Sequence, residues 1–377
     1  MCSKRTITHK NDIEELAYQV QKEGPEVDKI AKKSGQCKET VRNRFHKILM
    51  KGRKEYLQAA IDYERLGLTE AVAVIEFDPS LKSVAPLLLQ AMNIHGFLVS
   101  YARSSYDDMY LAMFNIPTGF YRRVERSLEY LHDTGVISRL EISRFDWFRA
   151  PPINPKMYDF EREVWDIEWP IETESNARIA KFTPPPVASV DYLDLLILKE
   201  LQRDANRGIS AIADSIHEGR RKVQWHTKKH VFGKHMVSGY RFRWMGENYQ
   251  NAQNAVLRRY KYEIIAILGR GLNTSRMKNM HNYLTRLPVT FCEAIGAQNY
   301  YAMIALPLES IGDGINHINA KLASDDCNVI IVPTDQSNAL TFTLPYERYD
   351  REKKRWVFNE GAFNEAFSMV TAAVKNK

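Results

Sequence analysis

The chain has 377 residues, of which 44% are hydrophobic, a formal net charge of +7 and a pI near 9.0. This length favours two to four domains, and the hydrophobic content excludes a largely disordered chain. The positive charge favours a polyanionic partner such as DNA, RNA or an anionic membrane surface.

Cysteine usage and the N-terminus narrow the class further. Cys2, Cys37, Cys292 and Cys327 lie far apart and form no CxxC pair, which argues against a disulfide scaffold or a thiolate zinc site. The N-terminus has no apolar secretory core, and no apolar run approaches the roughly 18 residues of a membrane span. We therefore predict a cytoplasmic protein with no membrane partner.

The sequence is a tandem repeat. The segment VAVIEF begins at residue 72 and EIIAIL at 263, an offset of 191. Upstream, IAKKSGQCKETVRNRF begins at residue 30 and IADSIHEGRRKVQWHT at 212, an offset of 182. An insertion of nine residues in the polar connector 246–254 of the second copy accounts for the difference between the two offsets. Three further pairs keep the first offset and begin at 97 and 288, 135 and 326, and 158 and 349. Such self-similarity predicts two copies of one module.

Each copy opens with a helical part. In the second copy, amphipathic periodicity predicts helices over 191–204, 209–216 and 219–231. The equivalents in the first copy are 12–24, 26–35 and 38–51. Two helices followed by a basic third helix are typical of a helix-turn-helix. The sequence MVSGYRFRW, which alternates about Gly239, predicts a short hairpin wing.

A β-α-β-β-α-β order follows each helical part. In the first copy, strands are predicted at about 70–78, 96–104, 108–116 and 135–143, with helices at about 81–93 and 118–133. This order is that of the ferredoxin-like fold. The predicted class is thus α+β, with two winged helix-turn-helix domains alternating with two ferredoxin-like domains. The predicted boundaries are 1–60 and 61–148 for the first copy, 149–189 for an aromatic and proline-rich linker, 190–248 and 249–345 for the second copy, and 346–377 for a hairpin-like segment and C-terminal helix.

The third helix of each copy contains the side chains that most directly indicate a function. Between Glu218 and Glu247 the chain has eight Lys or Arg residues and no acid. A helix in the DNA major groove needs long cations for phosphates and Arg, Asn or Gln for base edges. Trp225 is open to two interpretations, stacking on DNA or packing within the protein. The predicted DNA-binding residues are Lys38, Thr40, Arg42, Asn43, His46, Lys47, Arg220, Arg221, Lys222, Gln224, Trp225, Lys228, Lys229 and, on the wing, Arg241 and Arg243.

Other candidate residues are fewer. His226 and His230 are spaced i, i+4, as a zinc-binding pair requires, but no third ligand is visible at motif spacing, so no metal or cofactor is predicted. Tyr106, Asp107 and Asp108 lie between two predicted strands, where the carboxylates either grip the amino group of a small effector or cap a turn. No catalytic motif occurs, so no catalytic residue and no enzyme are predicted.

These segments resemble the leucine-responsive regulator/AsnC family of transcriptional regulators. The resemblance rests on DYLDLLILKELQRDANRGISAIADSI, on VSGYRFRW and on DYERLGLTEAVAVIEFD, and it covers most of the chain twice. It implies a tandem-duplicated regulator that binds double-stranded DNA, pairs as a homodimer or as a pseudo-dimer within the chain, and senses a small effector such as an amino acid. The effector loop departs from the family, since copy one has Ser where a Gly is usual and copy two keeps Gly296 but has no acid.

Two alternatives stay open. The two-part architecture also resembles that of haem-precursor (sirohaem-type) decarboxylases. These enzymes use a His on a strand in tetrapyrrole chemistry, and the corresponding strands of this chain offer only His95, at a strand start. A chromatin-like protein that coats DNA without sequence preference would show the same basic helices.

Overall fold

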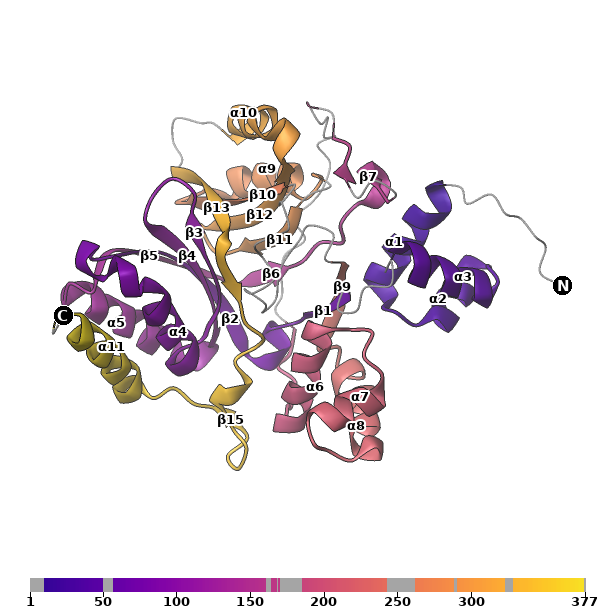
Figure 1. The fold of residues 1–377 in the computed structure, drawn as a ribbon, viewed down its shortest axis with the longest axis horizontal. Helices are drawn as coiled ribbons and strands as arrows, with labels where there is room; N and C mark the ends of the chain where they lie inside the picture. The colour runs from indigo at the N-terminus through magenta and orange to yellow at the C-terminus, as the bar shows by residue number, and fades with distance from the viewer. Residues whose placement is uncertain are drawn as a thin grey trace.

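The computed structural model describes residues 10–49, 57–160, 164–167, 169, 185–242, 262–287, 290–322 and 328–375. Within these ranges no helix is both long enough and apolar enough to cross a membrane. Two similar α/β halves lie side by side, and two small helical units lie at one side of them (Figure 1).

Both halves have the ferredoxin-like order predicted from the sequence. In each, the four strands are arranged 4-1-3-2 and two helices cover the outer face. The first half contains β2 (Leu68–Phe77), α4 (Ala85–His95), β3 (Leu98–Ser104), β4 (Met109–Pro117), α5 (Tyr121–Asp133) and β5 (Ile137–Phe145). The second contains β10 (Tyr262–Arg270), α9 (Thr274–Leu284), β11 (Thr290–Ile295), β12 (Tyr300–Pro307), α10 (Ile311–Leu322) and β13 (Asn328–Thr341).

The two halves form one sheet that closes on itself. The strand order is β5-β2-β4-β3-β13-β10-β12-β11-β6, where β6 is Trp147–Arg149. Only Asp146 separates β5 from β6 along the chain, and its amide donates to the Ile295 carbonyl at 2.9 Å. One stretch of chain therefore pairs with β2 at one edge of the sheet and with β11 at the other. β13 bridges the halves in the same way, pairing with both β10 and β3. The chain is thus a pseudo-dimer of its own two copies.

The helical units have the predicted three-helix arrangement. In both, the third helix ends in π-helical turns. A capping box begins α6, because the side chains of Asp191 and Asp194 accept from each other's backbone amides. The helices are α1 (Lys10–Glu23), α2 (Val27–Ser34) and α3 (Lys38–Arg44, continued to Leu49) in the first unit, and α6 (Tyr192–Arg203), α7 (Ile209–Ser215) and α8 (Arg220–His226, continued to Phe232) in the second.

The predicted hairpin wing about Gly239 is wrong. Gly239 lies inside a single strand, β9 (Val237–Phe242), which pairs antiparallel with β1 (Leu57–Ile61) of the other copy. Helix α6 packs on β1 and α1 packs on β9, so each helical unit rests on a strand of the other copy. Gly24, with φ +82°, lets α1 end against the ring of Tyr240, since a Cβ there would lie 2.5 Å from that ring.

The remaining elements complete the two cores. Short two-stranded ladders repeat at the same offset, and α11 (Glu360–Lys375) covers α4 and α5 with Phe363 and Phe367 fully buried. The ladders are β7 (Tyr158–Asp159) with β8 (Val164–Trp165), and β14 (Tyr349–Asp350) with β15 (Arg355–Trp356).

Candidate functional site

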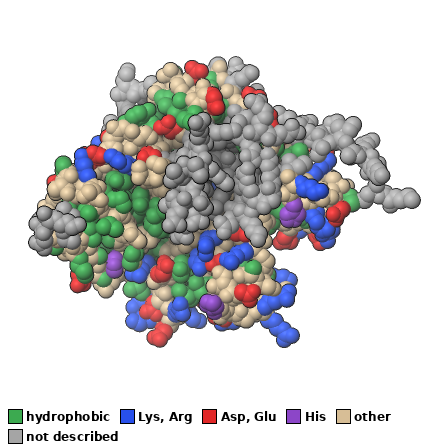
Figure 2. Space-filling view, viewed as in Figure 1, with side chains coloured by type: hydrophobic (Ala, Val, Ile, Leu, Met, Phe, Trp, Pro, Cys, Tyr) green, Lys and Arg blue, Asp and Glu red, His purple; other side chains and the backbone are tan. Residues whose placement is uncertain are grey.

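The third helix of the second copy, α8 with its π-helical continuation to Phe232, is the predicted recognition helix, and it has an exposed cationic face. Val223 and Val231 are fully buried and anchor the helix on its unit. Arg220, Arg221, Lys228 and Lys229 are exposed, and none of them forms an ion pair with an acid of the described residues. Lys222 alone is paired, with Glu218 at 3.0 Å. Figure 2 shows Lys and Arg side chains around this unit, which lies at the bottom of the view.

Two cations of the equivalent helix in the first copy are paired within their own unit. Arg42 pairs with Glu39 at 2.8 Å, and Lys38 pairs with Asp28 at 2.7 Å. Thr40, Asn43, His46 and Lys47 are exposed, so they face solvent as the sequence predicts. Because paired cations release fewer counterions from DNA, the two units differ in the electrostatic affinity that they can supply.

Three predicted DNA-binding positions need comment. Trp225 is 53% exposed, and its ring packs against the rings of His226 and His230 at 5.0 and 4.7 Å between centroids, so packing within the protein is present and stacking on DNA stays a prediction. Arg241 does not stand on a solvent-facing wing, because it lies on β9 and lines an internal cavity. Arg243 lies outside the described residues.

That cavity lies inside the closed sheet, beneath the β1–β9 pair. Its volume is about 330 Å³, and strands of both copies line it. This volume is at the lower end of the range of small-ligand cavities. Its polar lining residues include Gln58, Glu64, Glu70, Asn115, Arg149 and Arg241.

The polar groups of this cavity are poorly satisfied by the protein. The amides of Gln58 and Asn115 and one carboxyl oxygen of Glu70 are buried and accept or donate no hydrogen bond within the described chain. Glu70 and Asn115 are direct neighbours across β2 and β4. Buried polar atoms normally have a partner, so these groups are suited to hold a small polar ligand.

Burial changes the acidity of the two cavity glutamates. It raises the pKa of Glu64 to about 7, against the opposing hydrogen bond from the Phe148 amide. Burial and the nearby charge of Glu64 raise the pKa of Glu70 well above its usual range, and Arg241 offsets part of this effect. An amino group bound here would lie beside two carboxyl groups, and its positive charge would favour their ionised form.

A pH dependence of stability follows from Glu64. Its carboxyl loses its proton near pH 4.5 in the unfolded chain and near 7 in the folded chain. The folded state therefore binds more protons between these values, and the free energy of unfolding falls as pH rises, by about 1.4 kcal/mol per pH unit from this group. Urea titrations at pH 5, 6 and 7 should show this decline, and Glu64→Gln should flatten it. An equal slope in wild type and variant would contradict the prediction.

The predicted effector residues lie elsewhere. Asp108 pairs with Lys82 and Arg103, and the carboxylate of Asp107 accepts from the Met109 amide at 3.3 Å, as in a capped turn. Tyr106 is 78% exposed. None of the three lines the cavity, so the predicted effector loop and the cavity are different places.

Some candidate residues were not evident from the sequence. Glu70 shares a strand face with Val72 and Val74, but β2 is buried on both faces, so no alternation marked this acid as inward-facing. His95 is the last residue of α4 and not part of a strand. The cavity lining among described residues contains no histidine.

Comparison with known proteins identifies the fold class. No protein-family model and no curated protein matches this chain. Its tandem AsnC-like α+β architecture is shared along the whole chain with the siroheme decarboxylase NirDL, which is 9% identical, with 96% of this chain and 99% of that chain covered and a TM-score of 0.51. NirDL in complex with an iron-uroporphyrin III analogue gives a TM-score of 0.52 at the same identity and coverage.

Half-length matches include the transcriptional regulatory protein PF0864 from Pyrococcus furiosus, a member of the AsnC family. It is 14% identical, covers 36% of this chain and 88% of its own, and gives a TM-score of 0.30. The full-length likeness is thus to enzymes of the kind left open as the first alternative, and not to the predicted non-enzyme regulators. At 9% identity that likeness establishes the fold.

Proposed function

We propose that this chain is a DNA-binding transcriptional regulator that contacts double-stranded DNA through the second helical unit. The observation that carries the proposal is the exposed face of α8 and its π-helical extension, where Arg220, Arg221, Lys228 and Lys229 have no acidic partner in the described chain. Cations in this arrangement contact phosphates, and Gln224 among them offers a fork for a base edge.

The second part of the proposal is that the cavity binds a small effector. An α-amino acid would place its amino group beside Glu64 and Glu70 and its carboxylate beside Arg241. The cavity lies directly under the β1–β9 pair, on which both helical units rest. A ligand here would therefore change the support of the DNA-binding helices.

Selection from a random double-stranded DNA pool tests the function. The full chain, at about 0.15 M salt, is expected to enrich one family of sequences, and the unequal helical units predict a site without two-fold symmetry. Binding that random DNA competes equally well would indicate a DNA-coating protein instead. No retention of DNA by the chain would rule out both.

A tetrapyrrole decarboxylase is the second candidate, favoured by the full-length fold likeness to NirDL. Against it, a tetrapyrrole with several carboxylates would bring negative charge beside Glu64 and Glu70, and the cavity offers no described histidine. Titrating the protein with iron-uroporphyrin while recording absorbance separates the candidates. We expect the spectrum of the free compound; a shift that saturates at one equivalent per chain, with loss of carboxyl groups by mass, would favour the enzyme.

A further inference from the structure

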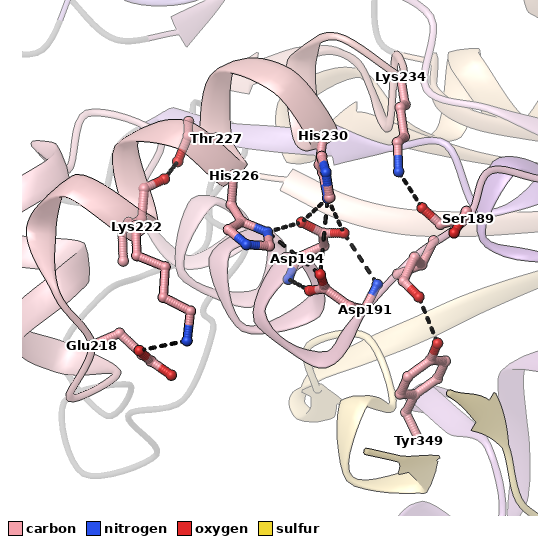
Figure 3. A network of polar contacts seen from close by, with 12 residues as sticks. Ser189, Asp191, Asp194, Glu218, Lys222, His226, Thr227, His230, Lys234 and Tyr349 are labelled. Atoms are coloured by element: carbon pink, nitrogen blue, oxygen red, sulfur yellow. Dashed lines mark hydrogen bonds and ion pairs between the residues drawn. The ribbon is translucent and has the colours of Figure 1, made fainter. Parts of the chain in front are cut away.

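Two histidines and two aspartates converge between α6 and the recognition helix. His226 and His230 project from the recognition helix towards Asp191 and Asp194 at the start of α6 (Figure 3). The ligand atoms of the four residues all lie within 4.8 Å of one another. The histidine pair is visible in the sequence. The two aspartates come from the start of another helix, and Asp194 lies 32 residues before His226 along the chain.

The distances fit a four-coordinate metal. From Asp194 Oδ1, the Nδ1 atoms of His226 and His230 lie at 2.8 and 3.2 Å, and from Asp191 Oδ2 they lie at 3.6 and 3.9 Å. A tetrahedral zinc site with bonds of about 2.0–2.2 Å has edges of about 3.3–3.5 Å, so these four distances bracket the required value. Small side-chain shifts would equalise them.

The capping box orients both carboxylates. Asp191 Oδ1 accepts from the Asp194 amide at 3.0 Å, and Asp194 Oδ2 accepts from the Asp191 amide at 3.1 Å. Asp191 Oδ2 and Asp194 Oδ1 face the histidines, and Asp194 Oδ2 also lies 3.0 Å from His230 Nδ1. Outer hydrogen bonds of this kind hold metal ligands in place. A surface pocket of about 470 Å³, lined by Asp191 and His226, gives an ion access from solvent.

The first copy shows how the same junction is built without a metal. At the offset of 182, Asp194 corresponds to Asp12 and His226 to Arg44 (194 − 182 = 12; 226 − 182 = 44). Arg44 pairs with Asp12 at 2.9 Å, so a permanent cation neutralises that carboxylate. Asp194 is fully buried and among described residues only the two histidines ion-pair with it. Buried carboxylates in proteins are paired with a positive charge or coordinate a metal, and among described residues Asp194 has no permanent cation such as the one that pairs with Asp12.

We propose that Asp191, Asp194, His226 and His230 bind one first-row divalent transition metal ion of the Zn²⁺ class, joining α6 to the recognition helix. Nitrogen and oxygen ligands in a tetrahedral arrangement suit zinc and cobalt better than magnesium or calcium. Because the site lies behind the cationic face, metal occupancy also stiffens the proposed DNA-binding helix; that consequence rests on the proposed function.

Metal titration of the full-length, tag-free chain tests the site. After chelator treatment, Co²⁺ is expected to bind at one equivalent with tetrahedral d–d absorption, Zn²⁺ to displace it, and Zn²⁺ to raise the melting temperature. His226→Arg copies the first unit and should fold normally but bind more than about 100-fold more weakly, as should His230→Gln, since even outer-shell changes cost 10–100-fold. His46→Gln, on the other recognition helix, should bind as wild type does.

Two results would overturn the site: no stoichiometric Co²⁺ binding by the wild-type chain, or unchanged affinity when His226→Arg and His230→Gln are combined. Circular dichroism of each variant distinguishes ligand loss from misfolding. His226→Arg is expected to stay folded, because Arg at this position copies the Arg44–Asp12 pair of the first unit. DNA retention measured with and without Zn²⁺ is a separate readout. Metal binding without DNA binding would leave the site intact and contradict only the proposed function.

Discussion

Replacing Arg220, Arg221, Lys228 and Lys229 with alanine is expected to lower the slope of log affinity for DNA against log salt by about 3 to 4. Each exposed cation that contacts a phosphate releases close to one counterion, and none of these four is neutralised by a described acid. Between 50 and 200 mM salt the wild-type chain should therefore lose roughly 100-fold more affinity than the variant. Fluorescence anisotropy with a labelled duplex, measured at several salt concentrations, gives the slope directly.

The first helical unit offers a control with the same change in charge. Four of its cations form ion pairs with acids of their own unit, at 2.5–2.8 Å. Substituting them with alanine should leave the salt slope nearly unchanged, because paired cations contribute few released counterions. An equal loss of slope in both variants would show that DNA contacts the two units alike. The control cations are Lys29, Lys33, Lys38 and Arg42.

The fold was largely predictable because the chain repeats. The offset of 191 and the hydrophobic alternation predicted both ferredoxin-like units, and the structure confirms this α+β tandem. What joins the copies was not predictable. The β5 strand was expected to end near 143, whereas the chain continues past Asp146 into β6 and closes the sheet. Sequence patterns specify strand faces but not which exposed edges will meet.

Gly239 shows the second limit. A Ser-Gly pair is typical of a turn, but glycine also occurs in strands where another backbone approaches. Here the backbone of α1 is that neighbour, since a Cβ on Gly239 would lie 3.2 Å from the Gln21 carbonyl oxygen. That contact exists only because the first unit packs on a strand of the second, so no local pattern could reveal it.

The candidate sites were predictable to different degrees. The cationic helix was evident because it is continuous in sequence. The cavity was not, because β2 is buried on both faces, and alternation then no longer distinguishes an inward Glu70 from a solvent-facing acid. The proposed metal ligands Asp191 and Asp194 look like ordinary helix caps, and only the packing of α6 against the third helix of that unit brings them to His226.

Closure of the sheet predicts the largest stability effect, at Glu293. This side chain on β11 is fully buried and accepts from three different elements: Tyr300 Oη at 2.5 Å, His281 Nδ1 at 2.6 Å and Arg149 Nε at 2.8 Å. Arg149 lies on β6, directly opposite Glu293 in the closing ladder. Glu293→Ala would leave the buried donors Tyr300 and His281, and the half-buried Arg149, without their acceptor and is expected to lower the free energy of unfolding by about 3–5 kcal/mol.

Glu141 provides the comparison, because it too is a strand glutamate with two arginine partners, Arg139 and Arg270, but its side chain is 27% exposed. Glu141→Ala should cost less than Glu293→Ala, since solvent reaches this side chain and replaces part of the lost contacts. Urea unfolding followed by both circular dichroism and tryptophan fluorescence measures the two variants, and amide hydrogen exchange should show faster exchange along β6 and β11 in Glu293→Ala alone. Equal stabilities of the two variants would mean that the buried network does not hold the sheet closed.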